Sequence, residues 1–175
     1  MSGDATRRLR FQALYEANYS AILGYALRRA PRDEAADVVA DTFLVAWRRI
    51  SDVPHGDEAR LWLYGAARRI LANRARSERR RNRIGAQLAA ETLPAQGDPP
   101  ETDAVARAFG RLRPEERELL ALVAWEGLSP AEASQVLGCS PNAARIRLYR
   151  ARRKLARELE ECALGAAAVG LGRTT

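Results

Sequence analysis

Residues 129–155 constrain the fold of this chain most, because they contain two helix starts separated by a helix stop. Ser129 and Ser140 each precede a proline, and this pair suits an N-cap followed by the first position of a helix. Gly138, between them, favours the left-handed conformation in which many helices end. Two helices joined by so short a turn predict a helix-turn-helix, whose second helix can lie in the DNA major groove.

The second helix of this motif separates apolar from basic side chains. An apolar stripe at helical spacing predicts the side that packs on the first helix, and it consists of Ala144, Leu148, Ala151 and Leu155. No acidic residue occurs between positions 133 and 157, whereas an ordinary solvated helix usually mixes both signs. We therefore expect the opposite side to contact base edges and phosphates of DNA. The residues expected to do so are Ser140, Asn142, Arg145, Ile146, Tyr149, Arg150 and Arg153.

The rest of the chain has helical periodicity, and no alternating strand pattern persists. Three amphipathic stretches predict a first helical bundle, with breaks at Pro31 and at the loop around Pro54 and Gly56. A proline-rich segment, 84–102, predicts a flexible linker. We therefore expect an all-α chain with two small helical domains, 1–83 and 103–161, of which the second contains the helix-turn-helix. A disordered tail, 162–175, is expected to follow.

The third predicted helix ends in a basic run. Its cations are Arg68, Arg69, Arg74, Arg76, Arg79, Arg80, Arg81 and Arg83, against the single acid Glu78. Phosphates attract arginine and unstacked bases stack on aromatic rings, so this helix, with Trp62 near its start, favours single-stranded nucleic acid. Core packing is the alternative for the aromatic rings, and it is the favoured one for Trp47 and Trp62.

The second predicted helix has two different sides. Its buried stripe is expected to be Val39, Phe43, Ala46 and Ile50. The opposite side carries Asp37, Asp41, Leu44 and Arg48. A leucine bordered by charges is equally compatible with a solvated surface and with a protein-docking face, so the residues alone leave both interpretations open.

Composition narrows the classes of function. The chain has 29 Lys and Arg against 22 Asp and Glu, and the net charge of +7 favours a polyanionic partner. It has no apolar run of membrane-spanning length and no signal-peptide core, so we expect a cytoplasmic protein without membrane insertion. Glycine motifs that bind nucleotides are missing, and His55, the sole histidine, has no partners at ligand or triad spacing. We therefore expect no enzyme, metal site or cofactor.

Together these segments resemble bacterial RNA polymerase sigma factors of the sigma-70 family, in the extracytoplasmic-function (ECF) group. Region 2 of that family is matched by FQALYEANYSAILGYALRR, DEAADVVADTFLVAWRRI and RLWLYGAARRILANRARSERRR. Region 4 is matched by LRPEERELLALVAWEGLSPAEASQVLGCSPNAARIRLYRARRKL. The resemblance implies a transcription initiation factor that binds core RNA polymerase, through its β′ clamp helices and β flap, and promoter DNA. It also implies a possible anti-sigma factor.

The resemblance also implies roles for individual residues. Docking on the β′ clamp helices is implied for Asp37, Asp41, Thr42, Leu44 and Arg48. Loop 51–58 corresponds to the segment that captures a flipped base of the −10 element. Contacts with the melted −10 strand are implied for His55, Trp62, Arg68, Asn73 and Arg76. The DNA-reading residues of the last helix fall at positions that read the −35 element. Ile146 departs from the small polar residue frequent there, and it can replace a base hydrogen bond by contact with a thymine methyl.

Two other interpretations stay open at the level of sequence. A free-standing helix-turn-helix regulator with a helical sensing or dimerisation domain explains the C-terminal half. It gives no use, however, to the basic third helix or to the outer side of the second helix. A helical adaptor with no DNA role leaves the acid-free helix unexplained. Binding to core RNA polymerase distinguishes the sigma factor from both.

Overall fold

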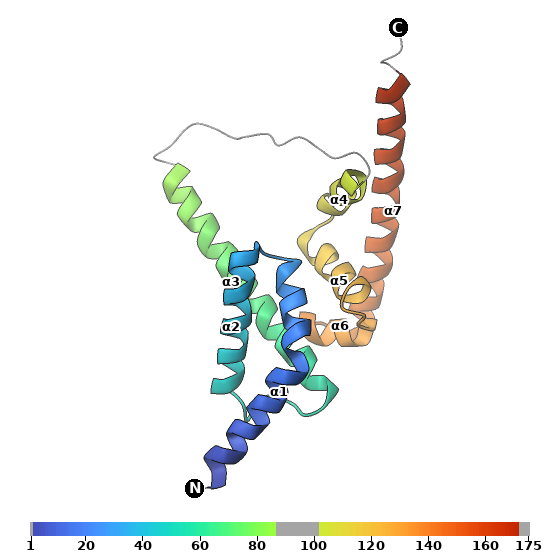
Figure 1. Ribbon diagram of the computed structural model, residues 1–175. Helices are drawn as coiled ribbons and strands as arrows, with labels where there is room; N and C mark the ends of the chain where they lie inside the picture. The colour runs from blue at the N-terminus through green and yellow to red at the C-terminus, as the bar shows by residue number, and fades with distance from the viewer. Residues whose placement is uncertain (1, 87–101, 172–175) are drawn as a thin grey trace. The chain divides into compact units, whose positions relative to one another are not determined.

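The computed structural model describes residues 2–86 and 102–171 of the 175-residue chain. Every regular element in these ranges is an α-helix, which confirms the all-α prediction (Figure 1). The helices are α1 (Ser2–Leu27), α2 (Arg32–Arg48), α3 (Asp57–Ala86), α4 (Thr102–Gly110), α5 (Pro114–Ala124), α6 (Pro130–Leu137) and α7 (Pro141–Leu171). They form two compact units, Met1–Glu91 and Thr92–Thr175. Most of the predicted linker, at 87–101, lies outside the described residues.

The first unit is a bundle in which α1, α2 and α3 all pack against one another. Its centre is apolar: Ile22, Val38 and Leu63, one from each helix, are fully buried. Tyr25 of α1 packs on Tyr64 of α3 with ring centroids 5.1 Å apart. Because Tyr64 is only 2% exposed, it belongs to the core of this unit.

A row of aromatic rings joins α1 to α2. Tyr15 packs on Phe43 with ring centroids 4.7 Å apart, and Phe11 packs on Trp47 at 5.2 Å. The guanidinium of Arg7 lies over the Trp47 ring, 4.4 Å from its centroid. These contacts support the core-packing interpretation of Trp47.

The loop between α2 and α3 is fixed to the bundle at its middle. Val53 is only 2% exposed, and its carbonyl accepts a hydrogen bond from the guanidinium of Arg10 on α1. Gly56 has a φ of +64°, a left-handed conformation that glycine adopts at low cost. The loop therefore has a fixed conformation, with Pro54 and His55 between the buried Val53 and the turn at Gly56.

In the second unit, α4, α5 and α6 each pack on α7. Ser129 caps α6, since its hydroxyl accepts the N–H of Glu132 at 3.2 Å while the Glu132 carboxylate accepts the N–H of Ser129 at 2.7 Å. Gly138 ends α6 with a φ of +68°. The hydroxyl of Ser140 then accepts the N–H of Ala143 at the start of α7. The structure thus contains the predicted helix-turn-helix.

The end of α7 corrects one expectation. The sequence predicts a disordered tail from residue 162, whereas α7 continues to Leu171. The segment is rich in alanine, the residue with the highest helix propensity, and it extends a helix that is already nucleated. Residues 172–175 of the predicted tail lie outside the described residues. None of the helices in the described ranges has the length and apolar character needed to cross a bilayer.

Candidate nucleic-acid interfaces and docking face

The outward side of α7 is basic and aromatic. Ala144, Leu148 and Ala151 are buried, which confirms those members of the apolar stripe. On the opposite side, Ile146 is 44% and Tyr149 62% exposed. Exposed polar and basic residues of the same helix region are Ser140, Asn142, Arg145, Arg150 and Arg153, and the guanidinium of Arg153 lies 5.8 Å from the centre of the Tyr149 ring. All seven residues expected to read DNA are therefore accessible to a ligand.

One flank of α7 faces the start of α5 across a cleft of about 520 Å³. Its lining residues are Arg113, Glu115, Glu116, Arg147, Arg150 and Lys154. Arg150 therefore lies at the edge of the recognition side, in a cleft that it shares with Arg147 and Lys154 of α7, with Arg113 just before α5 and with two carboxylates of α5. Sequence reasoning missed Arg113 and Arg147, although the helical spacing of Arg147 and Arg150 was a visible signal.

The outer side of α2 has the composition of a docking surface. Leu44 is 45% exposed, and the side chains of Asp37 and Asp41 are 70% and 48% exposed. Arg48 is exposed at the end of the same helix. We call Asp37, Asp41, Leu44 and Arg48 the docking face.

Thr42 does not belong to the docking face, and its expected role is wrong in this respect. Its side chain is fully buried, and its hydroxyl donates to the carbonyl of Val38 at 2.6 Å. The physical reason is helical spacing, because Thr42 follows Val38 by one turn and lies on the same buried side. A buried hydroxyl satisfied within its own helix cannot contact a partner directly.

Arg74 of α3 lies against this docking face. One of its guanidinium nitrogens is 2.7 Å from the Asp41 carboxylate, and another is 3.5 Å from that of Asp37. The hydrogen bond to Asp41 is the main cause that raises the pKa of Arg74 above its ordinary value. This arginine therefore faces α2 and forms ion pairs with the two carboxylates of that helix.

The predicted −10 residues of α3 lie along the exposed part of the helix. Helical spacing places Trp62, Asn73 and Arg76 in one row, while Arg68, which is half-buried, lies on another side. The Arg76 guanidinium donates to the side-chain carbonyl of Asn73. Trp62 is partly exposed, so one row offers an aromatic ring, an amide and a cation.

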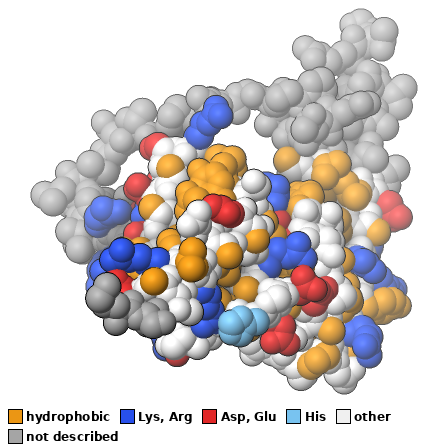
Figure 2. Space-filling model, turned by 60° about the horizontal axis from the view of Figure 1, so that its bottom comes forward, with side chains coloured by type: hydrophobic (Ala, Val, Ile, Leu, Met, Phe, Trp, Pro, Cys, Tyr) orange, Lys and Arg blue, Asp and Glu red, His pale blue; other side chains and the backbone are white. Residues whose placement is uncertain are grey.

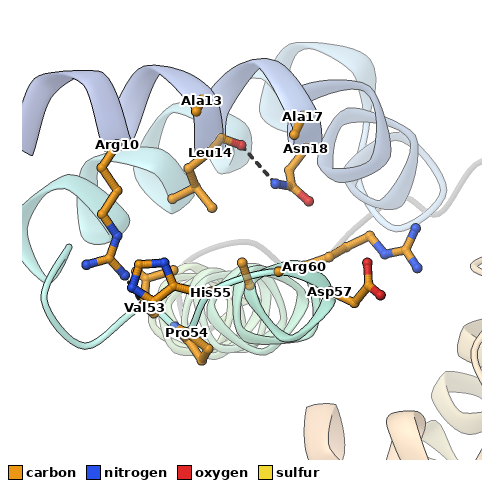
Figure 3. A pocket seen from close by; sticks show the side chains of 12 residues that line it. Arg10, Ala13, Leu14, Ala17, Asn18, Val53, Pro54, His55, Asp57 and Arg60 are labelled. Atoms are coloured by element: carbon orange, nitrogen blue, oxygen red, sulfur yellow. Dashed lines mark hydrogen bonds between the residues drawn. The ribbon is translucent and has the colours of Figure 1, made fainter.

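The remaining −10 candidate, His55, borders a cavity between α1 and the loop (Figure 3). His55 is exposed (pale blue in Figure 2), and the cavity has a volume of about 440 Å³. Its other lining residues are Arg10, Ala13, Leu14, Ala17, Asn18, Val53, Pro54, Gly56, Asp57, Ala59 and Arg60. Figure 3 shows Arg10, Leu14 and Asn18 extending from α1 toward the loop. Asn18 is 7% exposed, and its amide donates to the Leu14 carbonyl at 2.8 Å.

The structure therefore places the residues predicted to bind the −10 element in two separate locations. His55 lines this cavity, which we call the loop cavity, whereas the predicted −10 residues of α3 (Trp62, Arg68, Asn73 and Arg76) do not. Sequence reasoning missed Arg10 and Asn18, because the register of α1 against the loop is set by tertiary packing. In the described part of the chain, no three His, Cys, Asp or Glu side chains gather as a metal ion requires.

The two units match two conserved regions of one protein family. Residues 14–81 match the family model of sigma-70 region 2, and residues 102–155 match that of sigma-70, region 4. The chain is 32% identical over 160 residues to the ECF RNA polymerase sigma factor SigL of Mycobacterium tuberculosis, covering 86% of this chain and 89% of SigL. It is 34% identical over 148 residues to the RNA polymerase sigma factor CnrH of Cupriavidus metallidurans, covering 74% of this chain and 75% of CnrH.

Solved structures agree with these matches. CnrH, solved in complex with the cytosolic domain of CnrY, superposes with a TM-score of 0.60 at 28% identity, covering 86% of this chain and 88% of CnrH. The sigma factor RpoE from Bartonella quintana, solved with the anti-sigma factor NepR, shares the fold with a TM-score of 0.67 at 24% identity, covering 86% of this chain and 96% of RpoE. The chain therefore belongs to the ECF group of the sigma-70 family, the regulatory DNA-binding proteins that direct RNA polymerase to promoters for transcription initiation.

Proposed function

We propose that the first unit of this sigma factor binds core RNA polymerase through the docking face of α2 and that its partner is the β′ clamp helices. The observation that carries this proposal is the 45% exposure of Leu44 between charged side chains. An apolar centre with a charged rim is the usual anatomy of a protein interface. Asp37 and Asp41 give the face acidic groups, so the complementary polymerase surface is basic.

The same unit binds the −10 element with different residues. The loop cavity takes one flipped base, for which it offers the His55 ring and the buried amide of Asn18. The row of Trp62, Asn73 and Arg76 on α3 binds the melted strand by stacking and phosphate contact. Arg68, on another side of α3, supplies a separate cation for a backbone phosphate.

The second unit binds the −35 element through α7. Asn142, Arg145, Ile146 and Tyr149 lie nearest the start of the helix, which is the part that reaches base edges in a helix-turn-helix. Ser140 keeps its hydroxyl proton for a phosphate, because its oxygen already accepts the N–H of Ala143. Arg150 and Arg153 extend the contact along the DNA backbone.

Two further protein partners are proposed, the β flap of polymerase and an anti-sigma factor. The β flap of polymerase binds an apolar surface at Trp125. This side chain is 53% exposed and packs on Phe109 with ring centroids 5.5 Å apart. An anti-sigma factor is a further partner, since the related RpoE was solved with one. The site of action is the cytoplasm, where polymerase and promoter DNA meet. The protein acts by binding, without a catalytic residue or a cofactor of its own.

In vitro transcription with purified core polymerase across a promoter library tests the proposal. Leu44→Asp should abolish core binding and transcription, because it puts a charge at the centre of the docking face. Leu27→Asp is the matched control, since Leu27 is 43% exposed at the end of α1. Equal affinity of the two variants for core polymerase would show that the docking face does not bind it.

A further inference from the structure

The middle of the outward side of α7 is apolar, although the surrounding part of the helix is basic. Ile146 is 44% and Tyr149 62% exposed, and a spacing of three residues makes them neighbours on the helix surface. Ala144 and Leu148, two residues before and after Ile146, are buried, so Ile146 lies on the opposite side of the helix. We call Ile146 and Tyr149 the apolar pair. It occupies the part of the recognition helix that points most directly outward.

Cations flank the apolar pair on both sides. Arg145 and Arg150 are exposed, one on each side of it. The guanidinium of Arg153 lies 5.8 Å from the centre of the Tyr149 ring, within the reach of cation–π attraction. No acidic residue occurs between positions 133 and 157. The ligand of this surface is therefore a polyanion, and one that also presents an apolar group to the two exposed apolar side chains.

We propose that the apolar pair recognises the methyl group at C5 of a pyrimidine in the −35 element. Among the groups that base edges present in the major groove, the C5 methyl of thymine is the apolar one, and the others are hydrogen-bond donors or acceptors. 5-Methylcytosine carries the same methyl group at the same ring position, so it satisfies the same contact. This inference deepens the proposed −35 role of α7 and rests on it.

Ile146 is the residue that contacts the methyl group. It lies in the second turn of α7, in the part of a recognition helix that reaches base edges. Its β-branched side chain is stiff, so little rotamer entropy is lost when it packs against a methyl group. Tyr149, one turn farther along, covers the contact with its ring and keeps water from it. Asn142 and Arg145 remain available for hydrogen bonds to neighbouring bases.

Removing single methyl groups from the DNA tests the proposal. Holoenzyme of core polymerase and the full chain binds a fluorescein-labelled promoter selected from the library. Each thymine on either strand of the −35 element is replaced in turn by deoxyuridine, which lacks only the C5 methyl group. At one position the affinity should fall about 4-fold, the effect of exposing one methyl-sized group to water. A cytosine at that position should bind better, by a similar factor, once it is methylated at C5.

Protein variants assign this effect to the apolar pair. Ile146→Ala should bind the thymine and deoxyuridine promoters equally, whereas Ile146→Val, which keeps a branched side chain, should retain most of the difference. Tyr149→Phe should also retain it, because the ring and not the hydroxyl covers the methyl group. Val105→Ala is the matched control, since Val105 is a branched apolar side chain, 55% exposed on α4 of the same unit. The control should distinguish thymine from deoxyuridine as the wild type does.

Several outcomes would overturn the methyl contact and leave the −35 role of α7 intact. One is a holoenzyme that tolerates deoxyuridine at every position but still prefers its −35 element to a scrambled one. Another is a selected −35 element without thymine on either strand. A preference for thymine that persists in Ile146→Ala would likewise contradict the proposal, and a protein would then be the ligand to seek for the apolar pair. Equal binding of native and scrambled −35 elements would overturn the proposed −35 role as well.

Discussion

Glu116 and Lys154 join the start of α5 to the recognition helix α7, with carboxylate oxygen and ammonium nitrogen 3.5 Å apart. The same carboxylate accepts the backbone N–H of Arg113 at 2.9 Å, so one side chain both caps α5 and orients α7. The hydrogen bond from Arg113 is the main cause that lowers the pKa of Glu116, and the charge of Lys154 lowers it further. Folding of the second unit and presentation of its DNA-binding side therefore share a residue.

Replacing Glu116→Ala should destabilise the second unit by about 1 kcal/mol, the usual effect of losing a helix cap. The folded-state pKa lies below the unfolded-state value of about 4.3. The stabilisation is therefore fully present above that pH and is lost as the pH falls through the lower folded-state pKa. Hydrogen exchange of the α5 and α7 amides should show faster opening in the variant at pH 7, and the difference should vanish in acid. Glu115→Ala, at the exposed neighbouring position, should leave exchange unchanged.

Arg145→Ala should relax sequence preference at one position of the −35 element and cost about 1–3 kcal/mol of binding. The reason is its exposed place in the first turns of α7, the part of a recognition helix that reaches base edges. Competition binding of the holoenzyme to −35 variants, one base pair at a time, measures the effect. Uniform weakening on every sequence would make Arg145 a phosphate anchor.

Arg150→Ala should behave differently, because Arg150 lies in the cleft with Arg113 and Arg147. Binding should weaken alike on all sequences, and the slope of log K against log salt should fall by about 0.9 for the lost phosphate contact. Arg157→Ala is the control on the same helix, at an exposed position outside this cleft. A changed base preference in Arg150→Ala would contradict the assignment.

Local signals made the second unit predictable from sequence. Ser129, Gly138 and Ser140 act through their own backbone and that of close neighbours, so their roles follow from residue type and order. The buried stripe of α7 followed from helical spacing for the same reason. The outer position of Leu44 on α2 was also visible in the spacing, and its exposure agrees.

Tertiary pairings were beyond the reach of the sequence. Arg74 belongs by position to the basic run of α3, and only the packing of α2 on α3 brings it to Asp41. Arg10 and Asn18 reach the loop cavity because α1 lies across it, which no local pattern encodes. The glycines after residue 162 predict a disordered tail, whereas the alanines beside them, with their high helix propensity, continue α7 to Leu171.

The loop cavity leads to a prediction about promoter melting. Capture of a flipped base must offset a few kcal/mol of lost stacking, so the cavity has to keep its shape and offer contacts. Arg10 keeps the shape by holding the Val53 carbonyl, and His55 supplies a ring at the rim. Arg10→Ala with His55→Ala should therefore reduce permanganate-reactive thymines near −10 strongly. Core binding and −35 protection should persist, because the docking face and α7 are untouched.

Two point substitutions are preferable to replacement of the whole loop, because Val53 is 2% exposed and its loss would disturb the packing of the bundle. Arg8→Ala is the matched control, because Arg8 also projects from α1 but pairs with Asp4 at 2.8 Å. The control should open promoters as the wild type does. If thymines stay fully reactive in the Arg10→Ala, His55→Ala variant, the flipped base is held elsewhere, and the row of Trp62, Asn73 and Arg76 on α3 becomes the place to look for it.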